Sequence, residues 1–163
     1  MRHATAAMLI AALFATGMTS AFASGSEGLV VNTTSGTIDC SGRDVDVIAS
    51  DARLVFTGRC GHLHFTGDRT TATIEAATLL QVVGAAANLR IKSPLAEVLL
   101  LGDGGTFHFE SVEDLRVNGS GLRVEAARIG AVSLGGSRNQ VQWSAGSPSV
   151  HDLGNDNVLR PRP

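Results

Sequence analysis

Tyrosine is absent from this 163-residue sequence, and tryptophan occurs once, at Trp143. With six phenylalanines besides, aromatic side chains supply little apolar volume, so the core must depend on valine, leucine and isoleucine. Charged residues make up 17% of the chain, and the basic ones are scattered singly. A nucleic-acid-binding surface needs clustered lysine and arginine, so we expect no nucleic acid partner.

Several catalytic motifs are also missing. The chain has no G-x-S-x-G elbow, no H-E-x-x-H and no C-x-x-C pair. His151 and Asp152 are neighbours, but adjacent residues of a strand point to opposite faces. We therefore expect no enzyme and no cofactor.

Paired carboxylates for glycoside cleavage remain an alternative, since spacing alone does not rule them out. The acids expected to point outward are interspersed with basic residues, as on a solvated surface. These residues are Glu75, Glu97, Glu110 and Glu125 among Arg90, Lys92, Arg116 and Arg123.

Residues 1–23 have the pattern of a secretory signal peptide. Arg2 and His3 precede an uncharged run from Ala4 to Met18, which is too short to be a stable membrane span. Small residues at Ala21 and Ala23 predict cleavage before Ser24. We expect an exported protein, periplasmic or secreted, with no membrane span after cleavage.

The two cysteines, Cys40 and Cys60, are 20 residues apart. In an oxidising compartment such a pair normally forms a disulfide, which would stabilise the fold by about 3 kcal/mol in the chain-entropy model. The competing interpretation is a redox or zinc site, but two sulfurs without further ligands nearby make a poor zinc site. The sequence favours the disulfide.

A regular alternation of apolar and polar residues runs through the rest of the chain. Members of each apolar pair are two residues apart, and successive pairs recur every 7 to 10 residues. The pairs are Val45/Val47, Leu54/Phe56, Leu63/Phe65, Ala72/Ile74, Leu80/Val82, Leu89/Ile91, Val98/Leu100, Phe107/Phe109, Leu115/Val117, Leu122/Val124, Val132/Leu134 and Val141/Trp143. A spacing of two places both side chains on one face of a strand. Glycine-rich turns between the pairs predict an all-β chain of about a dozen short strands.

A period as regular as this favours a small β-solenoid, in which each coil stacks on the previous one and two units make a coil of about 18 residues. The separation of Cys40 and Cys60 is close to one coil. An antiparallel sandwich is the rival, because its strands have a similar spacing. We predict a repetitive domain over residues 37–160, a flexible leader with at most one strand over 24–36, and a tail over 161–163 that proline keeps out of the ladder.

Two stretches of this sequence resemble a known bacterial family. The first is Asp39-Cys40-Ser41-Gly42-Arg43-Asp44-Val45 with Thr57-Gly58-Arg59-Cys60-Gly61-His62-Leu63, and the second runs from Gly135-Gly136-Ser137-Arg138-Asn139 to Gly154-Asn155-Asp156-Asn157-Val158. Together they resemble the domain-of-unknown-function family numbered three thousand and sixty. Its members resemble strings of G-S-x-N-x-V units behind a signal peptide or a lipoprotein signal, with two cysteines bracketing the first unit. The resemblance extends over about residues 38–160 and implies no activity.

Histidine and acidic residues suggest two weak sites. His62 and His64 share the outward face of one strand, but a metal needs further ligands, and His108 is expected on the other sheet. Gly102-Asp103-Gly104-Gly105 is similar to a calcium β-roll turn but occurs once, so a corner explains it better. Asn32-Thr33-Thr34 and Asn118-Gly119-Ser120 match the glycosylation pattern, and in a bacterial protein they are a leader and a turn.

The sequence thus predicts an exported, non-enzymatic β-repeat protein of the bacterial envelope, acting as a structural or binding module. Its partner would be an unidentified protein or envelope polymer. The open ends of a solenoid also suggest self-association. A carbohydrate-active or metal-dependent enzyme on a β-solenoid is the alternative.

Overall fold

The computed structural model describes residues 28–162, and this part of the chain is all-β, without a helix. Its strands form a single sheet in which every pairing is parallel. They are β1 (Leu29–Val31), β2 (Ser35–Asp39), β3 (Val45–Ile48), β4 (Arg53–Thr66), β5 (Thr71–Val83), β6 (Ala87–Leu101), β7 (Gly105–Ser120), β8 (Leu122–Ser137), β9 (Gln140–Ala145), β10 (Ser149–Asp152) and β11 (Val158–Pro161). The predicted signal peptide and its cleavage site at Ala21, Ala23 and Ser24 lie outside the described residues.

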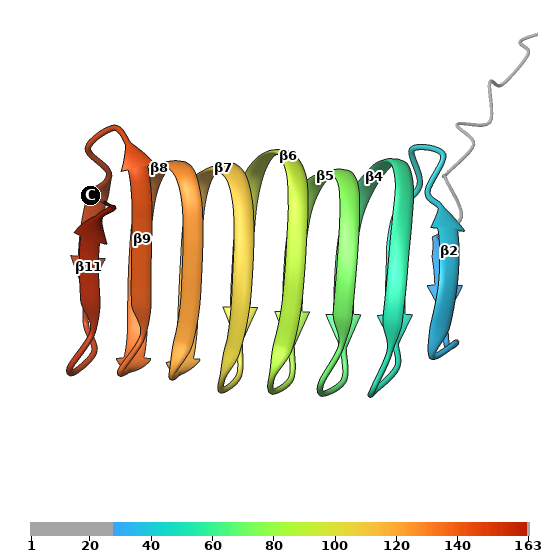
Figure 1. The fold of residues 1–163 in the computed structure, drawn as a ribbon, viewed down its shortest axis with the longest axis horizontal. Helices are drawn as coiled ribbons and strands as arrows, with labels where there is room; N and C mark the ends of the chain where they lie inside the picture. Colours follow the sequence, from blue (N-terminus) through green and yellow to red (C-terminus); the bar gives the residue numbers. More distant parts are fainter. Residues whose placement is uncertain (1–27, 163) are drawn as a thin grey trace, which may run out of the picture.

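The sheet winds into a β-solenoid, which confirms the predicted fold over the antiparallel sandwich. Each long strand rises along one flat side, bends over an arch and descends along the other side (Figure 1). The register offset between coils is 17 or 18 residues, as in the pairs Arg53 with Thr71 and Thr71 with Asn88. A tight turn at the edge opposite the arches then begins the next coil.

The coils present two outward faces, which we call face 1 and face 2. Face 1 consists of residues 35–39, 53–57, 71–75, 88–92, 106–110, 122–126, 140–144 and 158–162. Face 2 consists of residues 29–31, 44–48, 62–66, 79–83, 97–101, 114–118, 131–135 and 149–152. Within each face, equivalent residues of successive coils form straight rows along the molecule.

All twelve predicted apolar pairs lie in the core, with at most 8% of any of these side chains exposed. Besides buried residues at the turns, such as Ala52, Thr70 and Ala87, the sequence interpretation missed a buried row that lines the inside of the arches. It consists of Cys60, Ala77, Leu95, Val112 and Ile129. Because the arch curves, its residues do not keep the period of two by which the strands were recognised.

The predicted dozen short strands differ from the observed strands for the same reason. The chain stays hydrogen-bonded through the arch, so two predicted units merge into one strand of 13 to 16 residues in β4 to β8. The pairing shifts at the bends, for example between Phe56 and Arg59. The segment from Val112 to Leu115 has no glycine turn because it belongs to an arch.

Glycine is required at the tight turns because neighbouring coils approach closely there. A methyl group on Gly84 or Gly119 would overlap the carbonyl oxygen of the glycine one coil earlier. Two residues later each turn passes through a left-handed residue, such as Arg69 (φ 54°), Ala86 (φ 57°) or Gly121 (φ 69°). Several of these residues are not glycine, so the left-handed position tolerates side chains and the stacked position does not.

Asparagine fixes the turns of the last coils. Asn139 is fully buried; its Oδ1 accepts a hydrogen bond from the amide of Leu122 at 3.0 Å, and its Nδ2 donates one to the carbonyl of Gly119 at 2.9 Å. Asn157 repeats the role one coil later, accepting from the amide of Asn139 at 2.9 Å. The G-S-x-N-x-V unit is therefore a turn motif: stacked glycine, left-handed residue, bridging asparagine and inward valine.

Both ends of the domain extend further than predicted. In the expected flexible leader, β1 pairs with β3 and β2 begins at Ser35 and pairs with β4, so these residues form the first coil. At the other end, Pro161 pairs with Trp143 within β11. The amide of Val158 donates to the carbonyl of Asn139, just before β9, and that of Arg162 donates to the carbonyl of Trp143 in β9. Because successive backbone amides of a strand point to opposite sides, the nitrogen of Pro161 faces away from β9, toward the free edge of β11. Its missing N–H group therefore costs no hydrogen bond.

The predicted disulfide between Cys40 and Cys60 is confirmed, with the two Cα atoms 4.9 Å apart. Both cysteines are fully buried. The bridge joins the loop after β2 to the first arch, in β4, and so ties the first coil to the second. No free cysteine occurs in the described part of the chain.

Candidate functional site

The two faces differ in charge. Face 1 carries six basic and four acidic residues, and face 2 carries one basic and five acidic residues. On face 1 these are Arg53, Arg90, Lys92, Arg123, Arg160 and Arg162 against Asp39, Glu75, Glu110 and Glu125. On face 2 they are Arg116 against the outward acids Asp44, Asp46, Glu97 and Asp114, with Asp152 in inward register in the last coil. Between the two faces, the basic residues thus lie almost entirely on face 1, while Arg43, Arg59, Arg69, Arg128 and Arg138 lie in loops, arches and turns.

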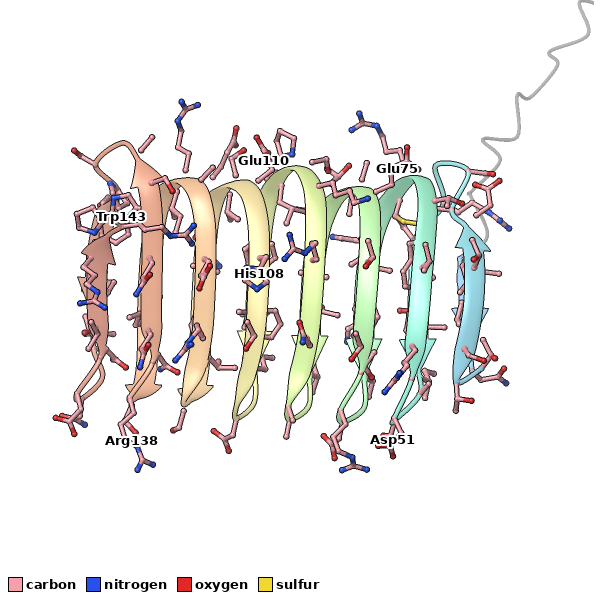
Figure 2. The ribbon with its side chains drawn as sticks, viewed as in Figure 1. Asp51, Glu75, His108, Glu110, Arg138 and Trp143 are labelled. Atoms are coloured by element: carbon pink, nitrogen blue, oxygen red, sulfur yellow. A yellow bond between two sulfur atoms is a disulfide. The ribbon has the colours of Figure 1, made fainter. Side chains whose placement is uncertain are left out.

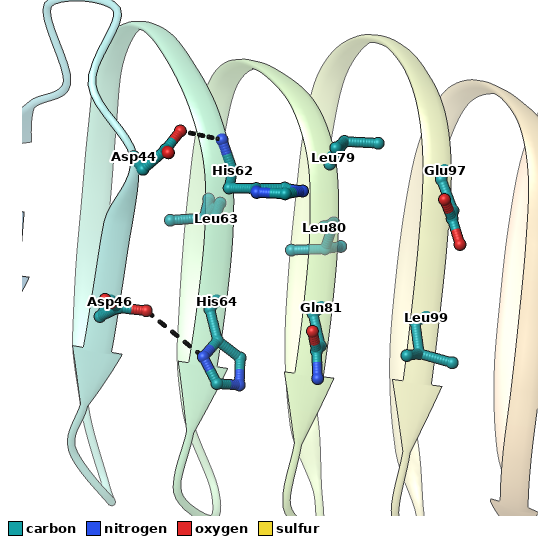
Figure 3. Close-up of a pocket in the computed structure, with 10 residues that line it drawn as sticks. All are labelled: Asp44, Asp46, His62, Leu63, His64, Leu79, Leu80, Gln81, Glu97 and Leu99. Carbon is teal, nitrogen blue, oxygen red and sulfur yellow. Dashed lines mark hydrogen bonds and ion pairs between the residues drawn. The ribbon is translucent and has the colours of Figure 1, made fainter. Parts of the chain in front are cut away.

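Face 2 contains the predicted histidine pair beside a hollow of about 360 Å³ (Figure 3). His62 and His64 both point outward from β4, as the alternation predicted. His64 Nδ1 lies 3.3 Å from Asp46 Oδ1, and the backbone amide of His62 donates to Asp44 Oδ1 at 2.7 Å. Both carboxylates thus already have partners within the protein.

The far side of this hollow is aliphatic. Leu79 and Leu99 line it, and Val83 and Leu101 follow them on the same strands. Glu97 is the acid on this side, two strands away from His62. The described residues contain no group of three or more histidine, cysteine, aspartate and glutamate side chains arranged to hold a metal ion. The hollow has the composition of a contact surface rather than a metal centre.

His108 lies on face 1, so the structure does not bring it near His62 and His64 (Figure 2). Its Nδ1 is 3.4 Å from Glu125 Oε2, and the same carboxylate oxygen accepts a hydrogen bond from Arg162 at 2.6 Å. A smaller hollow of about 210 Å³ adjoins His108 and is lined by Arg90, Lys92 and Glu110. This is the centre of face 1.

The pKa shifts in the structure belong to exposed ion pairs. A hydrogen bond from Arg69 lowers the pKa of Asp51 at the turn edge, and the same contact raises the pKa of Arg69. The pKa of Arg116 on face 2 is raised by a hydrogen bond to Asp114 and by the charges of Asp114 and Glu97. These groups are solvent-exposed side chains, which is typical of surface ion pairing.

Other residues singled out by sequence have structural places. Gly102-Asp103-Gly104-Gly105 spans the turn from β6 to β7, where Asp103 Oδ1 accepts from the amide of Ser120 at 2.8 Å. His151 and Asp152 do point to opposite sides, because they pair with outward Ser133 and inward Leu134. Asn118-Gly119-Ser120 ends β7 at a tight turn, and Asn32-Thr33-Thr34 joins β1 to β2. Residues 28–162 include no helix long and apolar enough to cross a membrane.

The last coil exposes part of the core. Val150 and Leu159 lie in inward register but are covered on one side only. Asp152, in inward register beside Leu134, accepts hydrogen bonds from the amide of Gly154 at 2.9 Å and from Asn157 Nδ2 at 2.8 Å. The carboxylate of Asp152 at an inward position and Pro161, which has no N–H group, disfavour the stacking of a further coil on this end of the sheet.

Comparison with protein families finds a match to the family that the sequence resembles, over a shorter stretch than the expected residues 38–160. Residues 100–156 match the family described as "Protein of unknown function (DUF3060)". The matched segment runs from the end of β6 to the turn before β11 and contains the glycine and asparagine turns. Cys40 and Cys60 lie outside it. No curated protein and no solved structure matches the chain.

Proposed function

We propose that this chain, whose residues 100–156 match a family of unknown function, is an exported, non-enzymatic binding module of the bacterial cell envelope. The observation that supports this proposal is how the motif residues are used. Glycine, asparagine and inward valine of the repeat build the turns and the core. The outward rows are then left as the part of the molecule that varies from coil to coil.

Rigidity favours the same function. Consecutive coils are joined by continuous parallel pairing through β4 to β8, and the first two coils also by the disulfide. Outward side chains therefore sit on a fixed lattice, with a strand spacing of about 4.8 Å. A ligand that matches such a lattice does not have to pay for ordering the protein on binding. The disulfide also agrees with an oxidising location outside the cytoplasm.

A carbohydrate-active or metal-dependent enzyme is the alternative. It would require carboxylates or metal ligands that converge on a substrate. Asp44 and Asp46, in the hollow of face 2, have partners in His62 and His64, and Glu97 stands two strands from His62. This arrangement favours binding over catalysis.

The test uses the disulfide-bonded chain from Ser24 onward with isolated envelope fractions, namely cell-wall sacculi and membranes. We expect the protein to sediment with one of these fractions. The soluble phase should contain no new reducing ends or short glycans after prolonged incubation, with and without added zinc. Release of such products would overturn the non-enzymatic function, and a protein left in the supernatant of every fraction would overturn binding.

A further inference from the structure

We infer that face 1 binds a linear anionic polysaccharide whose carboxylate or phosphate groups pair with its arginine and lysine side chains. The inference rests on the proposed binding function and names the ligand class. Its basis is an imbalance between cations and anions on this face.

Five cations of face 1 make no ion pair with any residue among 28–162. They are Arg53, Arg90, Lys92, Arg123 and Arg160. Outside face 1, Arg43, Arg59, Arg128 and Arg138 in the loops, arches and turns also make no ion pair among the described residues. Face 2 differs: Arg116, its one basic residue, is within 3.6 Å of Glu97 and 3.1 Å of Asp114. All five unpaired side chains of face 1 belong to exposed residues.

The acids of the same face are largely occupied by the protein's own donors. Glu75 accepts from the amide of Gly58 at 2.9 Å, and Asp39 accepts from the amide of Ser41 at 3.0 Å. Glu125 is bound by His108 and Arg162. Glu110, on the rim of the smaller hollow, is the exception. Face 1 thus offers unpaired cations to a ligand, while three of its four acids already accept hydrogen bonds or ion pairs from the protein.

The cations recur along the solenoid with a regular spacing. They lie on β4, β6, β8 and β11, whereas face 1 of the intervening β5, β7 and β9 carries none. Since adjacent strands are about 4.8 Å apart, positive charges recur roughly every 10 Å along the long axis. They alternate between two rows, because Arg53 and Arg123 share one row and Arg90 and Arg160 share the neighbouring one. Threonine and glutamine fill the rows between them, as at Thr73, Thr106 and Gln142, and can donate to hydroxyl or ring oxygens.

This spacing suits a sparse polyanion better than nucleic acid or a lipid surface. Double-stranded DNA presents one charge per about 1.7 Å of axis, which calls for denser basic clusters. A lipid surface favours closely clustered basic residues beside large apolar anchors. The basic residues of face 1 are instead spread along the solenoid, and its exposed aliphatic residues are two valines, Val55 and Val158. A polysaccharide with one acidic group per one or two sugars would lie across the strands, over the two neighbouring rows that hold these arginines.

The test measures binding of the disulfide-bonded chain from Ser24 to three polysaccharides of equal length: polygalacturonate, phosphorylated dextran and neutral dextran. Two variants with equal loss of charge are compared. Arg90→Gln with Arg123→Gln removes cations from face 1, and Arg116→Gln with Arg138→Gln removes them from face 2 and the turn edge. We expect binding to polygalacturonate, to phosphorylated dextran or to both, and none to neutral dextran. The face 1 variant should bind about tenfold more weakly. The slope of its log binding constant against log salt concentration should be smaller in magnitude by about 1 to 2. Preference between the two polyanions identifies carboxylate or phosphate as the source of charge.

Equal weakening in the control variant would overturn the inference, because the attraction would then depend on net charge alone. Tighter binding to a duplex oligonucleotide or to phosphatidylglycerol vesicles would also overturn it. If neither polyanion binds while the protein still sediments with envelope fractions, the inference fails and the proposed function stands. An unchanged unfolding midpoint in both variants shows that folding is intact.

Discussion

The stacked glycines of the tight turns make a sharp prediction: Gly119→Ala destabilises the fold far more than Gly121→Ala, two residues away. A Cβ on Gly119 would overlap the Gly102 carbonyl oxygen and lie 2.8 Å from its carbon. The obstacle is backbone, so no rotamer change relieves it. A Cβ on Gly121 meets nothing within 4 Å.

The magnitude follows from the bonds that hold these two coils together at the turn. The amide of Gly102 donates to Asn118 at 3.3 Å, and that of Gly104 donates to Ser120 at 2.8 Å. Separating the coils enough for a methyl group sacrifices both bonds, at about 1 kcal/mol each, and loosens the packing beneath them. We expect Gly119→Ala to lower the free energy of unfolding by about 3 kcal/mol.

Gly121→Ala incurs a smaller penalty. Its backbone is left-handed at φ 69°, which costs an alanine about 1 kcal/mol, and the less flexible unfolded chain offsets part of that. Equivalent turns carry Arg69, Ala86 and Arg138 at this position, so the conformation is accessible to residues with a Cβ.

Urea unfolding followed by Trp143 fluorescence and far-UV circular dichroism measures both changes. Trp143 is the only tryptophan, is 8% exposed and donates to the carbonyl of Gly146 at 3.3 Å, so unfolding alters its surroundings. At a urea m-value of about 2 kcal/mol per M, the midpoint of Gly119→Ala should fall by about 1.5 M and that of Gly121→Ala by less than about 0.5 M. Equal midpoints for the two variants would refute the role assigned to close coil stacking.

Four further predictions test other contacts. Asn139→Ala leaves the Leu122 amide and the Gly119 carbonyl without partners, and should cost about 2 to 3 kcal/mol in the same urea assay, whereas the exposed Asn88→Ala should cost less than about 0.5. Replacing Cys40 and Cys60 together by alanine should cost about 3 kcal/mol, and a reducing agent should reproduce this loss in the parent protein but change nothing in the variant. A hydrogen bond from Arg69 lowers the pKa of Asp51, so this pair contributes stability above the ordinary aspartate pKa of 3.8, and that stability is lost as the pH falls through the lowered pKa. Arg69→Gln should remove that part of the pH dependence in thermal melts between pH 2 and 6. An identical profile in the variant would contradict this prediction. Asp152→Leu combined with Pro161→Val should promote end-to-end association by giving the last coil an apolar residue and a free amide donor, so light scattering should report larger species than for the parent chain, and a persistent monomer would count against the capping role.

Much of this architecture can be predicted from the sequence because its physical causes are local. Strand side chains alternate with a period of two, so the twelve apolar pairs identified the inward rows of both faces, all of which are buried. The repeat length then gave the number of residues per coil, and the separation of Cys40 from Cys60 indicated that they would meet across one coil. The turn at Gly136-Ser137-Arg138-Asn139 could likewise be recognised from residue types alone.

The arches escaped prediction because curvature breaks the period of two. Leu95, Val112 and Ile129 are as buried as the paired residues, yet nothing in their spacing distinguishes them from turn residues. Pro161 misled in the opposite direction, since proline excludes a strand only where its nitrogen faces a partner. Which side of a strand is free is a property of the assembled sheet.

The surface shows the same division between local and tertiary information. The amino-acid sequence by itself determined the all-β repeat, the inward rows and the disulfide, because each depends on residue types and their spacing along the chain. The separation of charge between face 1 and face 2 was decided only by the tertiary structure. Arg53, Arg90, Arg123 and Arg160 are more than thirty residues apart in sequence, and only the winding of the coils places them on one side of the molecule.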